Sequence, residues 1–176
     1  KKQNYISELI SHMIDIWEQK ILHADLKPEN TLVFNGVAQF IDDDISRKIG
    51  DPIYRYSGTF DYSHPDLINL YINNLNGEDN SIECKEYLDT FSFSVTALEI
   101  LFEIKLEDLI KQNLEQRADE NNSTMVDLDL SELDKETVTS YVNELTLVLN
   151  NKEKLAKMIT DLTENYHIKN KPEIIA

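Results

Sequence analysis

Residues 21–33, Ile-Leu-His-Ala-Asp-Leu-Lys-Pro-Glu-Asn-Thr-Leu-Val, decide how the rest of this 176-residue chain is interpreted. The stretch holds a carboxylate (Asp25), an ammonium group (Lys27) and a carboxamide (Asn30) at short spacings in a loop that contains a proline. A hydroxyl that attacks a γ-phosphate needs an acceptor that orients it, cations that spread the developing charge, and ligands for the metal ion that bridges the phosphates. Asp25, Lys27 and Asn30 supply one of each, so the stretch is typical of phosphoryl-transfer chemistry.

Residues 21–33 resemble the catalytic loop of eukaryotic-type Ser/Thr protein kinases, in which His-Arg-Asp-Leu-Lys-Pro-Glu-Asn is a common form. The main departure is Ala24, which stands where arginine is usual. Residues 57–67 resemble the end of a kinase activation segment, with His-Pro-Asp in place of Ala-Pro-Glu, and residues 87–102 resemble the central helix of the C-terminal lobe. The resemblance implies a divergent kinase, of the kind that a bacterial effector or a protist would carry.

The resemblance implies a mainly α fold, the C-terminal lobe of a kinase, over residues 1–176. Its motifs fall within residues 5–103, and residues 104–176 form a divergent helical part. The N-terminal lobe of a kinase carries a Gly-rich loop and a lysine paired to a glutamate, and none of the four glycines here stands in a G-x-G-x-x-G arrangement. We therefore expect a C-terminal lobe whose N-terminal lobe belongs to a longer parent polypeptide. A natural half-kinase is the alternative.

Apolar spacing predicts how the catalytic loop is held. Apolar residues recur at helical intervals from residue 5 to residue 22, which predicts an amphipathic helix that leads into the loop. Asn35 and Gly36 separate two short apolar runs, residues 31–34 and 37–41. This pattern predicts a small β-hairpin directly after the loop.

The remaining stretches differ in character. Residues 87–102 are apolar on nearly every face and predict a helix in the interior. Residues 69–84 contain several asparagines and a glycine and predict an inserted surface loop. In the last third of the chain, apolar spacing predicts a short helix over residues 106–114 and two further helices over residues 138–149 and 155–162.

Composition limits the class of function. Asp and Glu outnumber Lys and Arg by 33 to 17, which gives a formal net charge of −16. This charge argues against a surface for nucleic-acid phosphates, although it could attract basic substrates. Cys84 is the single cysteine, so we expect no disulfide framework and a reducing compartment, the cytoplasm, or the host cytosol for a secreted effector. No apolar run reaches the length of a membrane span.

The resemblance assigns ATP, Mg²⁺ and a set of roles to the loop residues. Asp25 would orient the substrate hydroxyl and accept its proton, and Lys27 would neutralise charge on the γ-phosphate of ATP. A lysine at this position is typical of Ser/Thr kinases rather than Tyr kinases. Asn30 matches the carboxamide ligand of Mg²⁺. Glu29 would contact the ribose, and Leu32 would lie under the adenine ring.

A second Mg²⁺ ligand is predicted at the end of the hairpin, which would return beside Asn30. Asp42 directly ends the apolar strand, at the place of the metal-binding Asp in the Asp-Phe-Gly motif, and Asp43 and Asp44 follow it. Asp43 then occupies the Phe position, where a buried, unpaired carboxylate would cost several kcal/mol. We therefore expect a local rearrangement there. An acidic turn with no metal role is the alternative.

Three more residues match supporting positions of the family. Thr59 matches the threonine that hydrogen-bonds the catalytic Asp and Lys in Ser/Thr kinases. Asp89 matches the buried aspartate that holds the backbone of the catalytic loop. His23 is expected to pack in the core rather than to act in catalysis.

Ala24 carries an expectation about regulation. In kinases with arginine at this position, the guanidinium pairs with a phosphorylated residue of the activation segment and orders it. Arg47 and Arg55 lie in that segment, between Asp42 and Asp66, and we expect that they cannot anchor it from the catalytic loop. Activity would then not require phosphorylation of the segment, which would be held by packing or by a bound partner.

The leading interpretation is an ATP- and Mg²⁺-dependent kinase that phosphorylates Ser and Thr residues of proteins. A pseudokinase that serves as a binding or scaffolding module is the alternative, because Ala24 and Asp43 depart from the family pattern. A kinase-like phosphotransferase for small molecules is disfavoured, because Lys27, Thr59 and the His-Pro-Asp segment go with peptide substrates.

Overall fold

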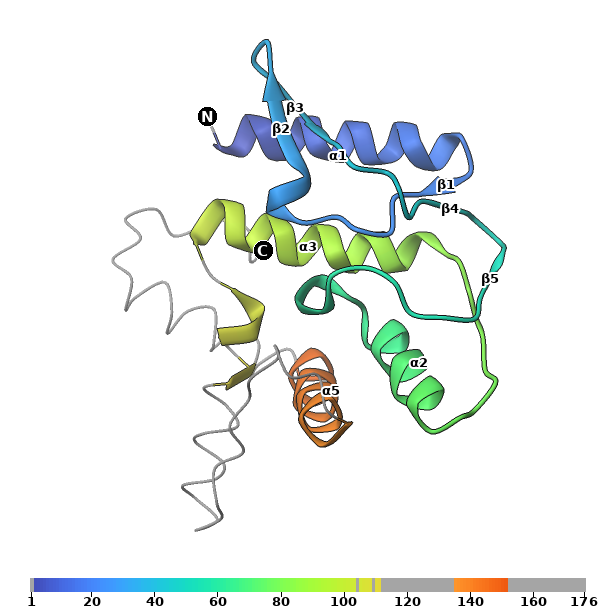
Figure 1. Ribbon diagram of the computed structural model, residues 1–176. Helices are drawn as coiled ribbons and strands as arrows, with labels where there is room; N and C mark the ends of the chain where they lie inside the picture. The colour runs from blue at the N-terminus through green and yellow to red at the C-terminus, as the bar shows by residue number, and fades with distance from the viewer. Residues whose placement is uncertain (1, 104, 109, 112–134, 152–176) are drawn as a thin grey trace.

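The computed structural model describes residues 2–103, 105–108, 110–111 and 135–151, and the fold of these residues is mostly helical. Figure 1 shows α1 and α3 in the upper half of the molecule, with α2 and α5 below them. The helices are α1 (Lys2–Glu18), α2 (Pro65–Leu75), α3 (Glu86–Phe102) and α5 (Lys135–Leu149).

The strands of the described residues form short antiparallel pairs. Strand β1 (Ile21–Leu22) pairs with β4 (Arg47–Lys48), β2 (Thr31–Phe34) with β3 (Val37–Phe40), and β5 (Pro52–Ile53) with β6 (Ile82–Glu83). Two 3₁₀ turns, η1 (Pro28–Asn30) and η2 (Phe60–Tyr62), complete the set.

Helix α3 is the centre of the packing, because its side chains enter all three apolar clusters of the described residues. Phe93 packs with Leu9 and Met13 of α1, and Val95 packs in the cluster that contains α5. Leu88 packs in the third cluster. The prediction of an interior helix over residues 87–102 is therefore confirmed, and its nearly continuous apolar surface is explained by neighbours on several sides.

The predicted hairpin is confirmed. Asn35 and Gly36 both have positive φ angles (51° and 83°), and Phe34 pairs with Val37 across the turn. Such a turn matches the twist of the two strands that it joins. The outer edge of β3 is closed by two side chains of α1, Glu8 and His12, which accept hydrogen bonds from the backbone N–H groups of Ala38 and Phe40.

The first helix ends earlier than predicted. Helix α1 ends at Glu18, and Lys20 adopts a left-handed φ of 63°. Ile21 and Leu22 form β1, paired with Lys48 and Arg47, instead of a last helical turn. The apolar spacing that suggested a longer helix also suits this strand, and only the distant partner strand decides between the two.

The prediction of a surface loop over residues 69–84 is wrong for its first half. Helix α2 runs to Leu75, and Ile68 and Leu70 are fully buried. The helix begins at Pro65, and the His64 side chain accepts a hydrogen bond from the Asp66 backbone N–H as its N-cap. Packing of the apolar face outweighs the weak helix propensity of its asparagines.

The last third of the chain is described in part. Leu106 and Ile110 are buried and lie in a helical stretch, and α5 corresponds to the predicted helix over residues 138–149. The predicted helix over residues 155–162 lies outside the described residues. In the part of the chain that the structure describes, no helix is both long enough and apolar enough to cross a membrane.

Candidate active site

The catalytic loop, residues 23–30, connects β1 to β2 (Figure 1). Buried residues of the loop are separated by partly or fully exposed ones. His23 and Leu26 are buried, with exposed fractions of 2% and 0%. The side chains of Asp25 and Lys27, on either side of Leu26, keep exposed fractions of 13% and 21%. His23 packs edge-to-face against Phe40, so it is a core residue, as expected.

The backbone of the loop is held from α3 by the carboxylate of Asp89, which is 1% exposed. The backbone N–H of His23 donates to Oδ2 at 2.9 Å, and that of Ala24 donates to Oδ1 at 3.0 Å. The indole Nε1 of Trp17 donates to Oδ2 at 3.2 Å. Burial, the largest influence, raises the pKa of Asp89 above its ordinary value, and these hydrogen bonds oppose that effect. Asp89 thus occupies the supporting position that the resemblance implied.

Four of the predicted site residues form one hydrogen-bonded cluster. Lys27 Nζ lies 2.8 Å from Asp25 Oδ2 and donates to Thr59 Oγ1 at 2.7 Å. The Thr59 hydroxyl in turn donates to Asp25 Oδ1 at 2.7 Å. Asn30 Nδ2 donates to the backbone oxygen of Asp25 at 2.9 Å and to its Oδ2 at 3.0 Å. Thr59 is 34 residues from Asp25 in sequence, so only the fold brings them together.

The cluster keeps Asp25 ionised. Burial is the largest single influence and favours the neutral acid. Hydrogen bonds from Lys27, Thr59 and Asn30, together with the charge of Lys27, outweigh it and hold the pKa of the Asp25 carboxyl below its ordinary value. A carboxylate in this state can accept a hydrogen bond from an incoming hydroxyl.

Thr59 reaches the loop because the chain approaches it closely at Gly58. Gly58 has a φ of +123°, and a Cβ atom placed there would lie 3.1 Å from the backbone oxygen of Ala24. Ala24 itself adopts a left-handed φ of 70°. The backbone therefore brings the activation segment into contact with the residue that precedes Asp25, and a side chain at Gly58 would disturb this contact.

The predicted metal ligands lie at adjacent ends of the hairpin. The Ile41 N–H donates to the Asn30 backbone oxygen at 2.9 Å, which brings Asp42 beside the catalytic loop. The amide nitrogen of Asn30 is used for Asp25, so its amide oxygen is the atom suited to a metal ion. Asp42 is exposed and has a left-handed φ of 65°. One carboxamide and one carboxylate oxygen suit Mg²⁺, which keeps several waters and binds substrate phosphates.

The structure does not gather a larger set of metal ligands. Among the described residues, no group of three or more His, Cys, Asp or Glu side chains could hold a metal ion. Asp43 and Asp44 are both exposed, so Asp43 is not buried at the position that a phenylalanine would fill. The cost of burying its carboxylate is avoided by this placement, in line with the expected rearrangement.

The two residues assigned to the nucleoside lie on the surface. Leu32 is 42% exposed, and Glu29 is exposed in the turn η1. Leu32 is thus not an ordinary core leucine. It belongs to a set of exposed apolar residues on one side of the hairpin, which we call the hairpin face: Leu32, Phe34, Val37 and Ile41.

Sequence reasoning missed several groups that position the loop. Trp17 lies within the apolar pattern of residues 5–22, and this pattern does not indicate that its indole N–H donates a hydrogen bond to Asp89. Thr96 Oγ1 donates to the backbone oxygen of Leu26 at 3.1 Å from the buried side of α3. A buried threonine in an apolar helix could have indicated such a contact, but its partner is 70 residues away.

Arg47 lies outside the catalytic loop, as expected, but it contacts the activation segment from β4, which the sequence did not predict. Arg47 lies in β4, directly opposite Leu22, the residue that precedes the catalytic loop. Its guanidinium donates to the Ser57 hydroxyl at 2.6 Å. The sequence does not reveal the pairing of β4 with β1, which fixes Arg47.

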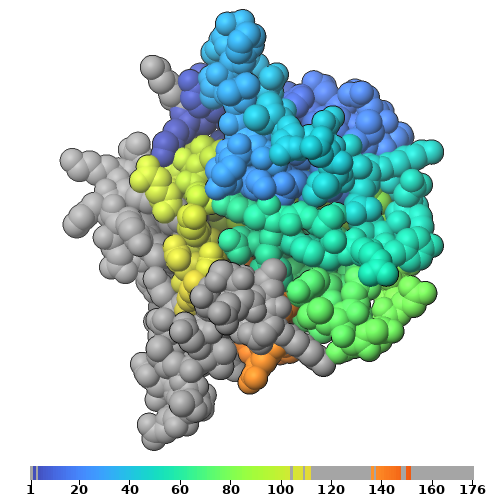
Figure 2. Space-filling model, viewed as in Figure 1, coloured from blue at the N-terminus to red at the C-terminus, as the bar shows by residue number. Residues whose placement is uncertain are grey.

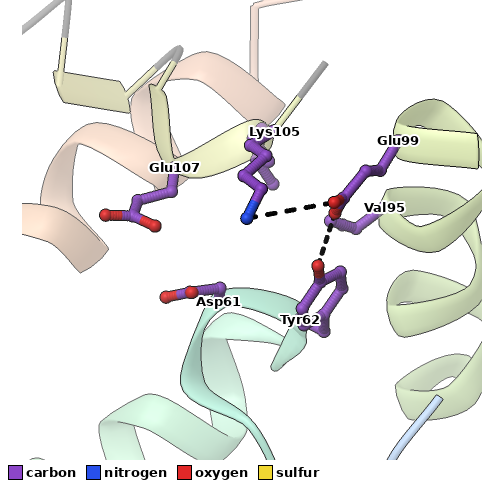
Figure 3. A pocket seen from close by; sticks show the side chains of 7 residues that line it. Asp61, Tyr62, Val95, Glu99, Lys105 and Glu107 are labelled. Atoms are coloured by element: carbon purple, nitrogen blue, oxygen red, sulfur yellow. Dashed lines mark hydrogen bonds and ion pairs between the residues drawn. The ribbon is translucent and has the colours of Figure 1, made fainter. Parts of the chain in front are cut away.

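A small pocket lies beside η2 and the end of α3 (Figure 3). Burial, followed by the charge and hydrogen bond of Glu107, raises the pKa of Asp61 to about 6. Tyr62 donates a hydrogen bond to Glu99, whose carboxylate also lies 3.9 Å from Lys105 Nζ. The pocket is lined by Asp61, Tyr62, Val95, Glu99, Lys105, Leu106 and Glu107.

Comparison with known proteins identifies a family, two relatives and a solved structure. Residues 1–169 match the family described as protein kinase domain. Serine/threonine-protein kinase SBK1 of Danio rerio is 38% identical over 52 residues, which cover 28% of this chain and 14% of that protein. Putative serine/threonine-protein kinase 040L of Invertebrate iridescent virus 3 is 36% identical over 80 residues, which cover 37% of this chain and 24% of that protein. The chain therefore matches about a quarter or less of each relative's length.

A solved structure, that of the Cydia pomonella Granulovirus kinase PK-1, is similar with a TM-score of 0.46 and 24% sequence identity. The match covers 59% of this chain and 36% of that chain.

The raised pKa of Asp61 predicts how stability depends on pH. The folded chain holds the Asp61 proton more tightly than the unfolded chain, so the contribution of Asp61 to the free energy of unfolding should fall as pH rises from about 4 to about 6. At pH 7, Asp61→Asn should raise this free energy by on the order of 1 kcal/mol, after allowance for partial exposure, and at pH 4 it should have little effect. Urea unfolding at both pH values measures the difference. Exposed Asp79→Asn is the control, and equal pH dependence in the two variants would contradict the assignment.

Proposed function

The chain belongs to the protein kinase domain family, and on this premise we propose that it is the C-terminal lobe of an ATP- and Mg²⁺-dependent kinase that phosphorylates Ser and Thr residues of proteins. The observation that carries the proposal is the hydrogen-bonded cluster of Asp25, Lys27, Asn30 and Thr59. The cluster brings together the ionised carboxylate of Asp25, the ammonium group of Lys27 and the amide of Asn30, a candidate metal ligand. The side chains of Asp25 and Lys27 are partly exposed. The hydroxyl of Thr59 connects the activation segment to this cluster.

The residues would act on the transferred group in distinct ways. Asp25 would accept a hydrogen bond from the substrate hydroxyl, align it with the γ-phosphate and take up its proton as the new bond forms. Lys27, which is shared between Asp25 and Thr59 in the present structure, would stabilise the charge that builds up on the phosphoryl oxygens. Mg²⁺ bound by Asn30 and Asp42 would supply charge neutralisation at the bridged phosphates.

The hairpin face supports the proposal that a second lobe covers this one. The face presents large apolar side chains, with exposed fractions from 39% at Ile41 to 62% at Phe34. Contiguous exposed apolar surface commonly marks an interaction site. An N-terminal lobe of the parent polypeptide would cover the face and enclose the adenine ring against Leu32. Glu29 would lie near the ribose.

The pseudokinase alternative rests on Asp43 and on Ala24. The exposed Asp42, Asp43 and Asp44 replace the motif that carries a metal ligand, and Ala24 removes a cation from the loop. A binding module would not need Asp25 to be ionised and paired. Phosphate transfer by the full-length parent distinguishes the two functions.

Replacement of the catalytic carboxylate is the most direct test. Asp25→Asn in the full-length protein should lower kcat by about 10²-fold or more, because the amide cannot accept the hydroxyl proton. Circular dichroism should show an unchanged fold. Exposed Asp51→Asn removes a charge of the same kind in the same lobe and should leave turnover unchanged. Equal turnover of Asp25→Asn and the parent protein would refute the assignment of Asp25.

The choice between the aspartates can be tested separately. Asp42→Ala should raise the Mg²⁺ concentration needed for half-maximal activity, and Asn30→Ala should do the same. Asp43→Ala, one residue along and equally exposed, is the matched control. If Asp43→Ala has the larger effect on the Mg²⁺ dependence, the metal ligand lies one residue further along than proposed.

The role of a second lobe predicts weak nucleotide binding by this chain alone. The described residues include the candidate site residues Asp25, Lys27 and Asn30, but none of their glycines stands in a Gly-rich loop that could cover the phosphates. Calorimetry should therefore detect poor ATP binding by residues 1–176 and much tighter binding by the full-length parent. Micromolar ATP affinity of residues 1–176 would instead indicate a self-sufficient half-kinase.

A further inference from the structure

The first half of the activation segment is fixed to the fold by backbone hydrogen bonds. Strand β4 pairs with β1, and β5 pairs with β6 just before α3. Between them, the Ile49 N–H donates to the Lys20 oxygen at 2.9 Å, and the Gly50 N–H donates to the Cys84 oxygen at 2.8 Å. Residues 47–53 are therefore attached on both sides, to the strand before the catalytic loop and to the strand before α3.

The second half is held mainly by side chains. Tyr54 is 57% exposed, and Arg55 is exposed. After them, Ser57 Oγ accepts the hydrogen bond from the Arg47 guanidinium at 2.6 Å. The Tyr56 and Ser63 hydroxyls lie 3.1 Å apart. Ser57 lies two residues before Thr59 in the sequence. The Arg47–Ser57 hydrogen bond therefore connects β4 to the chain just before Thr59. Figure 2 shows this part of the chain spread over the surface between the hairpin and α2.

We propose that Arg47 is a positioning residue, which holds the activation segment against the catalytic loop through its hydrogen bond to the unmodified Ser57 hydroxyl. This contact maintains the hydrogen bond from the Thr59 hydroxyl to Asp25. The inference rests on the proposed function and deepens it. It assigns Arg47, on β4, the anchoring task that Ala24 cannot perform from the catalytic loop.

The geometry explains why a neutral hydroxyl is sufficient. Arg47 is half-buried, and its backbone is paired with Leu22, so the guanidinium starts from a fixed strand. A hydrogen bond from a charged donor is about twice as strong as one between neutral groups. Gly58, the next residue after Ser57, already lies against the backbone oxygen of Ala24. Ser57 and Gly58, which make these two contacts, are adjacent, and Thr59 follows them directly, which leaves Thr59 little freedom.

The test compares Arg47→Ala with Lys48→Ala in the full-length parent. Lys48 is the neighbouring cation on the same strand, and it is exposed. Arg47→Ala should speed hydrogen exchange of the amides in residues 54–59 and lower kcat for myelin basic protein by about tenfold, with the KM for ATP unchanged. Arg47→Lys should restore part of kcat. Lys48→Ala should change neither measurement.

A double-mutant cycle isolates the Arg47–Ser57 contact. Ser57→Ala should reproduce the effects of Arg47→Ala, and the double variant should be no worse than either single variant. Unchanged exchange over residues 54–59 in Arg47→Ala would overturn the proposal. Loss of activity after phosphatase treatment of the parent protein, with recovery in Ser57→Asp, would also overturn it, because Arg47 would then bind a phosphate.

Hydrogen exchange does not depend on catalysis, so the two proposals can fail separately. A parent protein without phosphate transfer, in which Arg47→Ala still loosens only residues 54–59, would refute the proposed function and retain the positioning role. An active parent protein in which Arg47→Ala leaves hydrogen exchange unchanged would retain the proposed function and refute the positioning role.

Discussion

The carboxylate of Asp89 holds the backbone on which the candidate site is built. A buried carboxylate without partners would cost several kcal/mol, and the carboxylate of Asp89 accepts hydrogen bonds from His23, Ala24 and Trp17. The two backbone donors would themselves be costly to bury unpaired. Each side of the contact therefore stabilises the other, and the strained φ of Ala24 (70°) is held between them. The side chains of α3 enter every apolar cluster of the described residues, which fixes this helix in the fold. Because Asp89 belongs to α3, its hydrogen bonds fix the catalytic loop to the same helix.

A fixed loop allows a small number of polar contacts to define the site. Lys27 lies between Asp25 and Thr59, and its ammonium group lowers the cost of placing a carboxylate in a half-buried position. In a chain with a net charge of −16, the local balance of charge matters more than the total, because exposed charges are screened over about 10 Å at moderate salt. The same reasoning explains the different behaviour of Asp61, which faces Glu107 and has a raised pKa.

The sequence predicted the elements whose signals are local. The catalytic loop is defined by residue types at fixed offsets, the hairpin by Asn35 and Gly36, and α3 by its apolar length. The end of α1, the part of α2 after residue 68 and the position of Arg47 could not be predicted in this way. Each depends on contacts with residues that are distant in the sequence. Ile21 forms a strand because it pairs with β4, and Arg47 is fixed because it pairs with Leu22. Helix α2 continues past residue 68 because its apolar face, which includes Leu70, is buried. The hydrogen bond of Trp17 to Asp89 was hidden for a related reason, since an apolar stripe does not reveal which of its members carries a buried donor.

The departures from the kinase pattern lie where the structure supplies a local substitute. His64 replaces an alanine, and its ring accepts the Asp66 N–H and caps α2. Asp66 replaces a glutamate, and its carboxylate accepts a hydrogen bond from Tyr87 at 2.7 Å. Asp43 stands at a phenylalanine position but is exposed, so no buried charge results. Asp25, Lys27, Asn30 and Thr59 form a cluster that has no such substitute, because each contributes a different atom to it. At each of these four positions the chain keeps the residue of the kinase pattern.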